Sequence, residues 1–594
     1  MDIRVPIIVK DPQVTAFTDI PATEEISIKG EELFLDGPIN ARVAVLDFDP
    51  VTGCLADGAR FERPRRNTPG RYTLLDPHLL TATDVTQVSV FGTVIKTMTM
   101  FEEPDALGRK LVWAFDGSQL LVVPRAGEWQ NAFYERESHS LQFFFFSHPD
   151  EDRTIFTVHS QDIVSHETAH AILDGIAPDL YNATSPQSLA IHEAIADITA
   201  VLGAFRSRQL RDRVLEQTGG SIQNATAFSG IAEQFGTALN KPLGHLRDLL
   251  NTKSLAPDAL ASDGVDRGDP HDVSQVLSGA LYTVMVQLHE SLKDEFAFPT
   301  PASGSMVERG EAVAQLAAAG FGDETSRPVA PLDAAARRVA RARVALKALV
   351  VAADRFKRTI FRGLDYLPPG EASFADLGRA IIASDEASHP ESDGQREWIR
   401  GEFLRRGIVE DLSELNVETN FEDAAVSSLE LEVLVESDWA AYQFANTNRK
   451  LLRIPDDTPF RVHPRLDVTK KYYHKEGPQT VRECLFKVSW SQVEANRIGT
   501  GNMPAERQIT VGTTLAVDWK TRRIRALLTS ESAPQTADRD LLLLGLIEND
   551  LLKEDKEAFG PDGKMLCAAI RSEEINGIMR VKGAARMLHI SSGH

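Results

Sequence analysis

The sequence predicts an α+β protein with more than one domain, and three observations carry that prediction. The chain has 594 residues, of which 42% are hydrophobic, and at a prior of about 150 residues per domain this is enough for two to four globular domains. Both ends of the chain contain short strand-like stretches separated by turn signals. The central region has long stretches with helical periodicity.

The N-terminal residues 1–70 are predicted to form a small β-rich segment. Asp36-Gly37-Pro38 and Thr68-Pro69-Gly70 are turn signals between its strand-like stretches. No catalytic pattern of residues occurs here. We therefore expect this segment to be a leader to the functional part of the chain.

Residues 71–295 are predicted to begin as a mixed α and β region and to continue into helices. A helix is expected around Thr83 to Met100. Strands are expected at 111–115 and at Asn131-Ala132-Phe133-Tyr134.

Residues 296–412 are predicted to be helical. A Pro/Gly/Ala/Ser-rich insertion near 298–331 interrupts the helical pattern. Ala334 to Ala353 is rich in Ala and Arg, which predicts a helix whose charges form a solvated face. Further helices are expected up to about residue 408.

Residues 413–594 are predicted to form an α+β accessory domain. Glu483 to Trp490 and Gln508 to Trp519 alternate between apolar and polar residues, which predicts strands. Asp538 to Glu554 has helical periodicity. Substrate selection, autoinhibition and binding of a partner protein are all open as roles for this domain.

The composition argues against one class of partner and indicates a cellular setting. The net charge of −22, from 64 basic and 86 acidic side chains, argues against nucleic acid, whose phosphates demand a positive surface. No signal-peptide-like stretch follows Met1, and no run of about 20 apolar residues could span a membrane. Three scattered cysteines imply no disulfide framework. We expect a cytoplasmic protein, and export by a specialised secretion machine stays open.

The most informative motif is His166-Glu167-Thr168-Ala169-His170. Positions i and i+4 of a helix lie on one face, so both imidazoles can reach one metal ion while Glu167 points toward the open side of the metal. This is the HExxH pattern of zinc peptidases. The pattern predicts zinc ligands at His166 and His170, and zinc then needs a third protein ligand and a position for water.

A third ligand is predicted on a second helix. Residues 189–198 have helical periodicity and place Glu193 and Asp197 four residues apart on one face. The alternative is a solvated acidic helix face, but the neighbouring HExxH helix favours a metal site. Glu193 would be the ligand, because the apolar neighbours suit it better than His192. Asp197 would accept the outer N–H of a ligating histidine.

The combined pattern resembles the thermolysin-like zinc metallopeptidases, gluzincins whose third ligand lies in an NExxSD-type helix. Asp162-Ile163-Val164-Ser165 runs into HETAH here, and HEAIAD at 192–197 is the second motif. His192 replaces the usual Asn of the family. The spacing between the two motifs is a few residues longer than in thermolysin, which fits a loop insertion around Ser185-Pro186-Gln187. The resemblance covers roughly residues 75–410.

The resemblance implies further catalytic residues. The family has a tyrosine eleven residues past the second histidine of HExxH, and that position is Tyr181. It also has a histidine oriented by an aspartate five residues earlier, and these positions are His271 and Asp266. Tyr181 and His271 would stabilise the oxyanion of the tetrahedral intermediate. Without the motif, a surface histidine and a half-buried turn tyrosine would be the ordinary interpretations.

The resemblance also implies substrate-binding residues. Asn131-Ala132-Phe133-Tyr134 resembles the NAFW edge strand of the family, in which Asn131 and Ala132 would bind the substrate main chain. Leu246 to Leu250 resembles the helix-to-loop segment that supplies an arginine to a substrate carbonyl, so Arg247 is the candidate. The family likeness further implies a hydrophobic residue on the leaving side of the cleavage.

The chain departs from the family at the double calcium site. One calcium ligand of the family is the aspartate four residues before HExxH, here Asp162, but the partner position is Ala204 and the residues at 205–211 are basic. A paired site for hard cations needs many carboxylate oxygens. We therefore expect zinc without the double calcium site, and we expect Asp162 to cap the HExxH helix.

The function implied by the resemblance is that of a zinc-dependent endopeptidase acting on a peptide or protein. The catalytic domain would have two lobes, a mixed β/α lobe with the catalytic helices at 71–295 and an all-helical lobe at 296–412. Glu167 would take a proton from the zinc-bound water and deliver it to the leaving amine. One alternative is a catalytically silent thermolysin-like fold that acts as a protein-binding or effector scaffold. Another, a gluzincin aminopeptidase, needs an acidic motif for the substrate N-terminus, and NAFY favours the endopeptidase.

Overall fold

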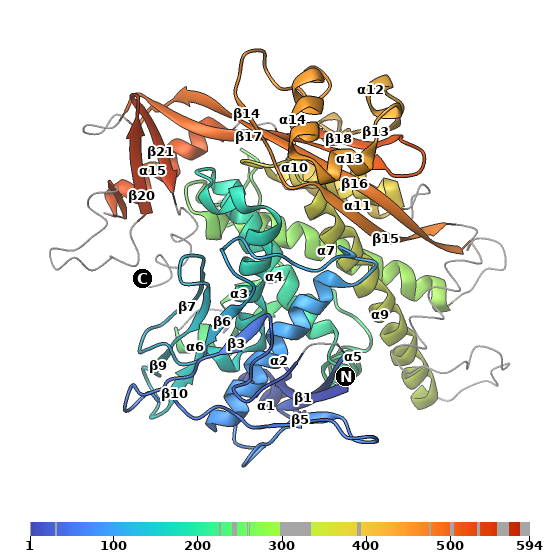
Figure 1. Ribbon diagram of the computed structural model, residues 1–594. Helices are drawn as coiled ribbons and strands as arrows, with labels where there is room; N and C mark the ends of the chain where they lie inside the picture. The colour runs from blue at the N-terminus through green and yellow to red at the C-terminus, as the bar shows by residue number, and fades with distance from the viewer. Residues whose placement is uncertain are drawn as a thin grey trace.

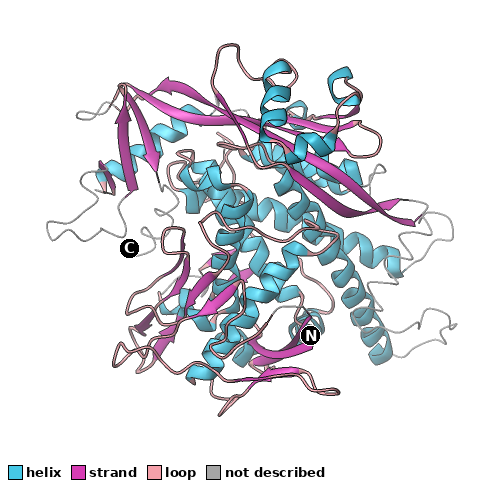
Figure 2. Cartoon of the chain, in the orientation of Figure 1, coloured by secondary structure: helices cyan, strands magenta, loops and turns pink. Residues whose placement is uncertain are grey.

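The protein is a mixed α+β structure, as the sequence predicts. In the computed structural model, helices gather in the centre of the molecule and strands lie around them (Figures 1 and 2). The structure describes residues 2–29, 33–224, 227–239, 246–257, 259–260, 262–297, 334–388, 394–474, 477–498, 504–530, 535–549, 551–554 and 570–582.

The N-terminal segment forms a four-stranded sheet with the strand order β2-β1-β5-β4. Val5 and Ile7 of the central strand β1 (Asp2–Ile8) are buried against helix α2 (Thr83–Glu102). Gly92 of α2 allows this close packing, because a Cβ atom there would lie 2.6 Å from Cγ2 of Ile7. The predicted helix near 83–100 is thus confirmed. The remaining elements are α1 (Pro12–Thr18), β2 (Thr23–Lys29), β4 (Phe61–Glu62) and β5 (Gly70–Tyr72).

A second sheet lies beside the central helices and has the order β3-β6-β8-β7. Strand β7 (Ala132–Glu135) is at its edge, pairs antiparallel with β8 and packs against α3. The predicted strand at 131–134 is therefore present, but the one at 111–115 is wrong. Trp113 and Phe115 are buried there in irregular chain, with ring centroids 5.8 Å apart. The other strands of this sheet are β3 (Val43–Val45), β6 (Leu120–Val123) and β8 (Ser140–Phe143). Strands β9 (Phe145–Ser147) and β10 (Thr154–Phe156) pair with each other in a separate sheet.

The central helices are α3 (Gln161–Ile176), α4 (Pro186–Phe205) and α7 (Pro270–Ala297), and α4 packs between the other two. Helix α4 is long and apolar enough to cross a membrane, so the expectation that no stretch of this kind occurs is wrong, but α4 is buried inside the fold. The predicted loop at Ser185-Pro186-Gln187 is wrong, because Pro186 begins α4 at a position where its missing N–H costs nothing. Shorter elements follow: α5 (Arg208–Thr218), β11 (Gly230–Ile231), α6 (Glu233–Ala238) and β12 (Arg247–Asp248).

Three further helices, α9 (Ala334–Tyr366), α10 (Phe374–Ser388) and α11 (Gln395–Arg405), complete the helical region. The predicted Ala- and Arg-rich helix is part of α9. Arg341 and Arg343 are exposed while Ala345 is buried, so α9 has the expected solvated face. Phe361 of α9 stacks on Phe101 of α2 with ring centroids 3.7 Å apart. The predicted insertion near 298–331 lies outside the described residues.

The C-terminal region contains a nine-stranded sheet within the described residues, drawn in orange and red in Figure 1. Its two long strands β16 (Gly477–Ala495) and β17 (Glu506–Asp518) pair from Glu483 to Ala495, as expected from their alternating pattern. The helix predicted to reach Glu554 ends at Glu548, and the chain then forms β19. The other elements are β13 (Glu418–Phe421), α12 (Ala424–Ser427), α13 (Leu431–Glu436), α14 (Asp438–Thr447), β14 (Phe460–Val462), β15 (Leu466–His474), β18 (Ile524–Thr529), α15 (Thr536–Glu548), β19 (Leu552–Glu554), β20 (Ile570–Ile575) and β21 (Ile578–Lys582).

Buried charges join the C-terminal sheet to the helical region. Lys470 of β15 lies between Asp365 of α9 and Glu483 of β16, with Nζ–O distances of 2.9 and 3.1 Å. All three side chains are completely buried. Arg109 also contacts Asp365, at 2.8 Å, and the Tyr366 hydroxyl donates to Glu483 at 3.1 Å. Because an unpaired charge is costly in such a place, this network sets one position for the sheet on the helices.

Replacing Lys470 should therefore destabilise the protein. Lys470→Met removes the shared cation and leaves Glu483 buried without its partner, so we expect the free energy of unfolding in urea to fall by about 3 kcal/mol. Arg4→Met is the control, because Arg4 and Glu25 form an exposed pair whose loss should cost less than about 1 kcal/mol. Equal losses for the two variants would contradict this account.

Candidate metal centre

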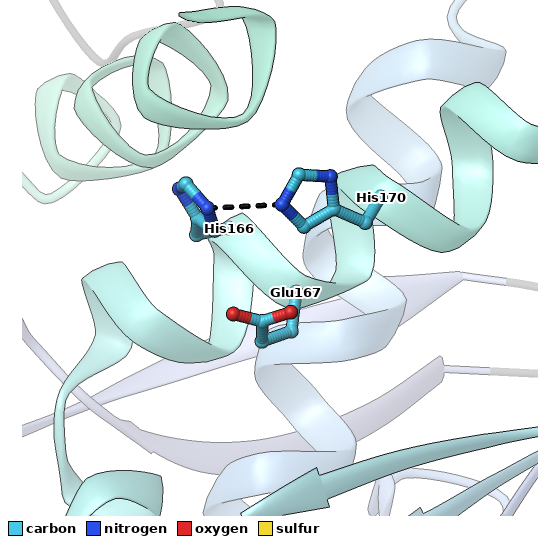
Figure 3. Close-up of side chains that lie close together, drawn as sticks. All are labelled: His166, Glu167 and His170. Atoms are coloured by element: carbon cyan, nitrogen blue, oxygen red, sulfur yellow. Dashed lines mark hydrogen bonds between the residues drawn. The ribbon is translucent and has the colours of Figure 1, made fainter. Parts of the chain in front are cut away.

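Helix α3 presents two buried imidazoles on one face. His166 and His170 lie one turn apart, and their Nε2 atoms are 3.0 Å from each other (Figure 3). A neutral imidazole carries one ring proton, on either Nδ1 or Nε2. If the outer nitrogens carry the protons, the two facing Nε2 lone pairs converge on a position for a cation.

Helix α4 adds a carboxylate to the same point. Glu193 Oε1 lies 3.2 Å from His170 Nε2, and Glu193 Oε2 lies 3.5 Å from His166 Nε2. Two ligand atoms of one tetrahedral zinc ion, each about 2.05 Å from the metal, are roughly 3.3 Å apart. The three groups are therefore spaced as ligands of one metal ion would be.

The outer nitrogen of each histidine also has a neighbour. Asp197, one turn after Glu193 on α4, places Oδ1 3.0 Å from His166 Nδ1, which favours a proton on that nitrogen. His192 Nδ1 lies 3.2 Å from His170 Nδ1. His192 therefore faces the Nδ1 atom of His170, whereas Glu193 faces the Nε2 atom. This geometry does not favour His192 as a ligand.

The electrostatic surroundings keep Glu193 ionised. Burial alone would raise the pKa of Glu193, but the charges of Arg247, His271 and His166 hold it well below its ordinary value. Burial would lower the pKa of His166, but Glu193 and the hydrogen bond to Asp197 raise it to about 10. The centre therefore binds a proton on His166 in the absence of a metal, and a metal ion would displace that proton.

Glu167 lies on the turn between the two histidines, with its carboxylate beside them (Figure 3). Burial is the main cause that raises its pKa to about 8; His166 lowers the pKa and Glu193 raises it further. The backbone N–H of Tyr134, in strand β7, donates to Glu167 Oε2 at 3.1 Å. A carboxyl group held in this way and titrating near neutral pH is suited to receive and return a proton.

Arg247 contacts carboxylates of the centre. Its guanidinium lies 2.6 Å from Glu193 Oε2 and 3.0 Å from Asp197 Oδ1. The predicted helix-to-loop segment at 246–250 is wrong, because Arg247 belongs to the short strand β12 opposite Ile231. The structure thus places Arg247 at the site, with an ion-pairing role that the sequence does not predict.

His271 lies at the start of α7 and faces the centre, with Nε2 3.9 Å from Glu193 Oε2. The carboxylate beside its Nδ1 is Asp269, at 3.5 Å, and the pKa of Asp269 is lowered because its contacts with His271 outweigh burial. Asp266, the predicted orienting residue, instead accepts from the backbone N–H of Gly268. The path of the loop before α7 brings the nearer aspartate to the histidine.

Tyr181 contacts residues of the segment around β7. It lies in the 3₁₀ helix at Pro178–Asn182, and its ring packs against Tyr134 and under the guanidinium of Arg136, 4.1 Å from the ring centroid. Tyr181 is not among the residues that line the cavity. Its role at the oxyanion stays a prediction.

The cavity has a polar end and an apolar wall. His166, Glu167, Glu193, Asp197, Arg247 and His271 line the polar end, Asn131, Ala132 and Thr157 also face the cavity, and the apolar wall is formed by Ile163, Ile231, Ala232, Phe235 and Leu246. Sequence reasoning missed this wall. Ile163 could have been found from its helical spacing to Glu167, whereas the segment at 231–235 carries no recognisable pattern.

Asp162 does not cap α3 as predicted. It is the second residue of that helix, and its Oδ2 contacts Nζ of Lys10 at 2.5 Å. The helix begins after Ser160 without a side-chain cap. The lysine ammonium group therefore neutralises the buried aspartate that resembles a calcium ligand of the family.

Neither a protein-family model nor a curated protein matches this chain.

Zinc should bind to these donors, and loss of the carboxylate should weaken it. Loss of a residue that hydrogen-bonds to a metal ligand typically lowers metal affinity by about 10- to 100-fold, and we expect a decrease of about this size in the zinc affinity of Asp197→Asn. Glu193→Gln removes the anionic ligand itself, so we expect its zinc affinity to fall further. Competition with a fluorescent zinc chelator measures both. Glu216→Gln, an exposed change on α5, is the control. Zinc affinity that is equal in Glu193→Gln and the wild type would show that Glu193 is not a ligand.

Proposed function

We propose that this protein is a zinc-dependent endopeptidase. The observation that carries the proposal is the convergence of His166, His170 and Glu193, from two packed helices, beside a buried carboxyl group in a cavity. Two imidazoles, a carboxylate and an open side form the ligand set of hydrolytic zinc sites. The proposed fold is a two-lobe thermolysin-like catalytic domain, with a mixed β/α lobe and the catalytic helices at 71–295 and an all-helical lobe at 296–412.

Glu167 is the proposed general base and acid. Zinc, when bound, lowers the pKa of a coordinated water to about 7 and polarises a substrate carbonyl. Glu167 is next to the ligands and lines the same cavity, so its carboxylate is placed to accept a proton from that water and to return it to the leaving amine. The N–H of Tyr134 holds this carboxylate toward strand β7, where the substrate would lie.

His271 and Arg247 bring side-chain nitrogen atoms to the cavity of the centre. His271 is held by Asp269 and faces the cavity, so its Nε2 can donate to an oxyanion that develops there. Arg247 also lines the cavity, and its pairing with Glu193 and Asp197 fixes the guanidinium in place. In this proposal, substrate stabilisation relies on these two residues and does not include Tyr181 or Asp266.

The substrate would bind as an extended peptide along β7. This strand is at the edge of its sheet among the described strands, and an edge strand can add a further strand by main-chain hydrogen bonds. Asn131 and Ala132 line the cavity at the beginning of β7. The apolar wall next to the polar end supports a preference for a hydrophobic residue beside the scissile bond.

The second candidate is a catalytically silent scaffold, and one observation favours it. Arg247 lies 2.6 Å from Glu193, so an internal cation already neutralises the carboxylate that zinc needs. If this contact keeps zinc from the site, the protein cannot cut peptides, and binding of other proteins is then the role that the scaffold candidate gives it. Zinc content and peptide cleavage distinguish the two candidates.

Glu167→Gln tests the proposed function directly. The amide has the same shape but cannot accept a proton, so we expect an unchanged zinc content and a loss of about 10³-fold in kcat/KM for casein-derived peptides. Peptide cleavage followed by mass spectrometry and zinc content by elemental analysis are the two measurements. Glu216→Gln should retain full activity.

Turnover of the Glu167→Gln variant at the wild-type rate would overturn the proposed mechanism. Zinc bound by the wild type without cleavage of any peptide in a random library would favour the scaffold.

A further inference from the structure

The dipeptide Lys10-Asp11, between β1 and α1, is buried near the candidate centre although it takes no part in the proposed chemistry. Only 1% of Lys10 and none of Asp11 is exposed. Burial of two charged side chains is unfavourable unless they are paired and hydrogen-bonded. Their contacts therefore indicate which parts of the structure they hold together.

Lys10 joins the start of α3 to the segment that begins at Gly230. Its backbone oxygen accepts from the N–H of Gln161, the first residue of α3, at 2.6 Å. Its Nζ donates to Asp162 Oδ2 at 2.5 Å and to the backbone oxygen of Gly230 at 2.9 Å. One residue thus connects the helix that carries the zinc-ligand histidines with a chain segment about 70 positions later.

Asp11 and Asp162 hold the same segment at two further points. Asp11 Oδ1 accepts from the N–H groups of Gln13 at 2.9 Å and Gln234 at 3.2 Å. Asp162 Oδ2 accepts from the N–H of Ala232 at 3.3 Å. The chain from Gly230 to Gln234 is therefore held by a carbonyl and two amide groups.

This segment forms most of the apolar wall of the cavity. It carries Ile231 and Ala232 and leads into Phe235, and all three line the cavity. Leu246 is attached to it through its N–H, which donates to the backbone oxygen of Ile231 at 2.9 Å. The fifth wall residue, Ile163, follows Asp162 directly. Each apolar wall residue is thus connected to the contacts of Lys10 and Asp11.

The backbone at Ala232 needs such support. Its φ is +55°, in the left-handed region that residues with a side chain rarely adopt. A conformation of this kind persists when the surrounding contacts impose it. The hydrogen bonds at Gly230, Ala232 and Gln234 lie on both sides of this residue.

We propose that Lys10 and Asp11 are positioning residues that set the shape of the apolar wall, and through it the side chain that the site accepts beside the scissile bond. This inference rests on the proposed endopeptidase function. It makes the N-terminal segment a part of the substrate-binding structure, although the sequence suggests only a leader.

The first test needs no catalysis. Hydrogen exchange of the metal-free protein is compared between Lys10→Met and Lys357→Met. The second variant is a matched control, because Lys357 of α9 is also a buried lysine, paired with Glu103 and Asp105. We expect exchange of the amides at 230–236 to rise by about tenfold or more in Lys10→Met only. Unchanged exchange there, or an equal rise in the control, would overturn the proposal. If Lys10→Met does not fold, Lys10→Gln, which keeps an N–H donor group but loses the charge, takes its place with the same expectations.

The second test measures specificity in the zinc-loaded protein. Two peptides differ only in leucine or alanine after the scissile bond. We expect the leucine-to-alanine ratio of kcat/KM to fall by about tenfold in Lys10→Met, mainly through KM, and to stay unchanged in Lys357→Met. Lys10→Arg, which retains the charge, should recover part of the ratio.

The two proposals fail separately in these experiments. An unchanged ratio in an active Lys10→Met variant would show that the dipeptide has a structural role only. If the wild type cleaves neither peptide, the endopeptidase proposal fails, and the exchange experiment still decides whether Lys10 holds the wall.

Discussion

Two carboxylates, Glu193 and Asp197, are buried in the apolar helix α4, and the arrangement of the centre depends on how they are neutralised. Both are at most 1% exposed. A buried carboxylate is tolerated when cations or hydrogen-bond donors surround it. Here the donors are the imidazoles of α3, the guanidinium of Arg247 and the imidazole of His271. The packing of α3 on α4 therefore fixes the imidazoles of α3 and the carboxylates of α4 relative to one another before any metal binds.

Buried charges also join distant parts of the chain. Lys10 connects the N-terminal segment to α3, and Lys470 connects the C-terminal sheet to α9. Such contacts are selective, because a shifted position would leave a charge buried without a partner. Apolar packing alone would tolerate several similar positions. The ionic contacts thus give the separate regions defined positions relative to the cavity.

The C-terminal region also contacts the loop that precedes His271. Arg267 lies 3.8 Å from Asp538 at the beginning of α15, and a Cβ atom on Gly268 would lie 3.3 Å from Leu541 of the same helix. Asp269, beside His271, is the next residue of this loop. The C-terminal region therefore contacts the segment that brings His271 to the cavity.

The sequence by itself determined the features that follow from local periodicity. The spacing of His166 and His170, and of Glu193 and Asp197, places each pair on one helix face wherever that helix packs. The same holds for the exposed and buried sides of α9. The α+β class follows from these periods as well.

Only the tertiary structure decided the contacts between segments that lie far apart along the chain. It placed Asp269 rather than Asp266 beside His271 and paired Asp162 with Lys10, 152 positions earlier. It also formed the apolar wall from a segment without a motif. The physical reason is that loop paths and the pairing of buried charges depend on the whole packed core, whereas helical and strand periods depend on neighbouring residues alone.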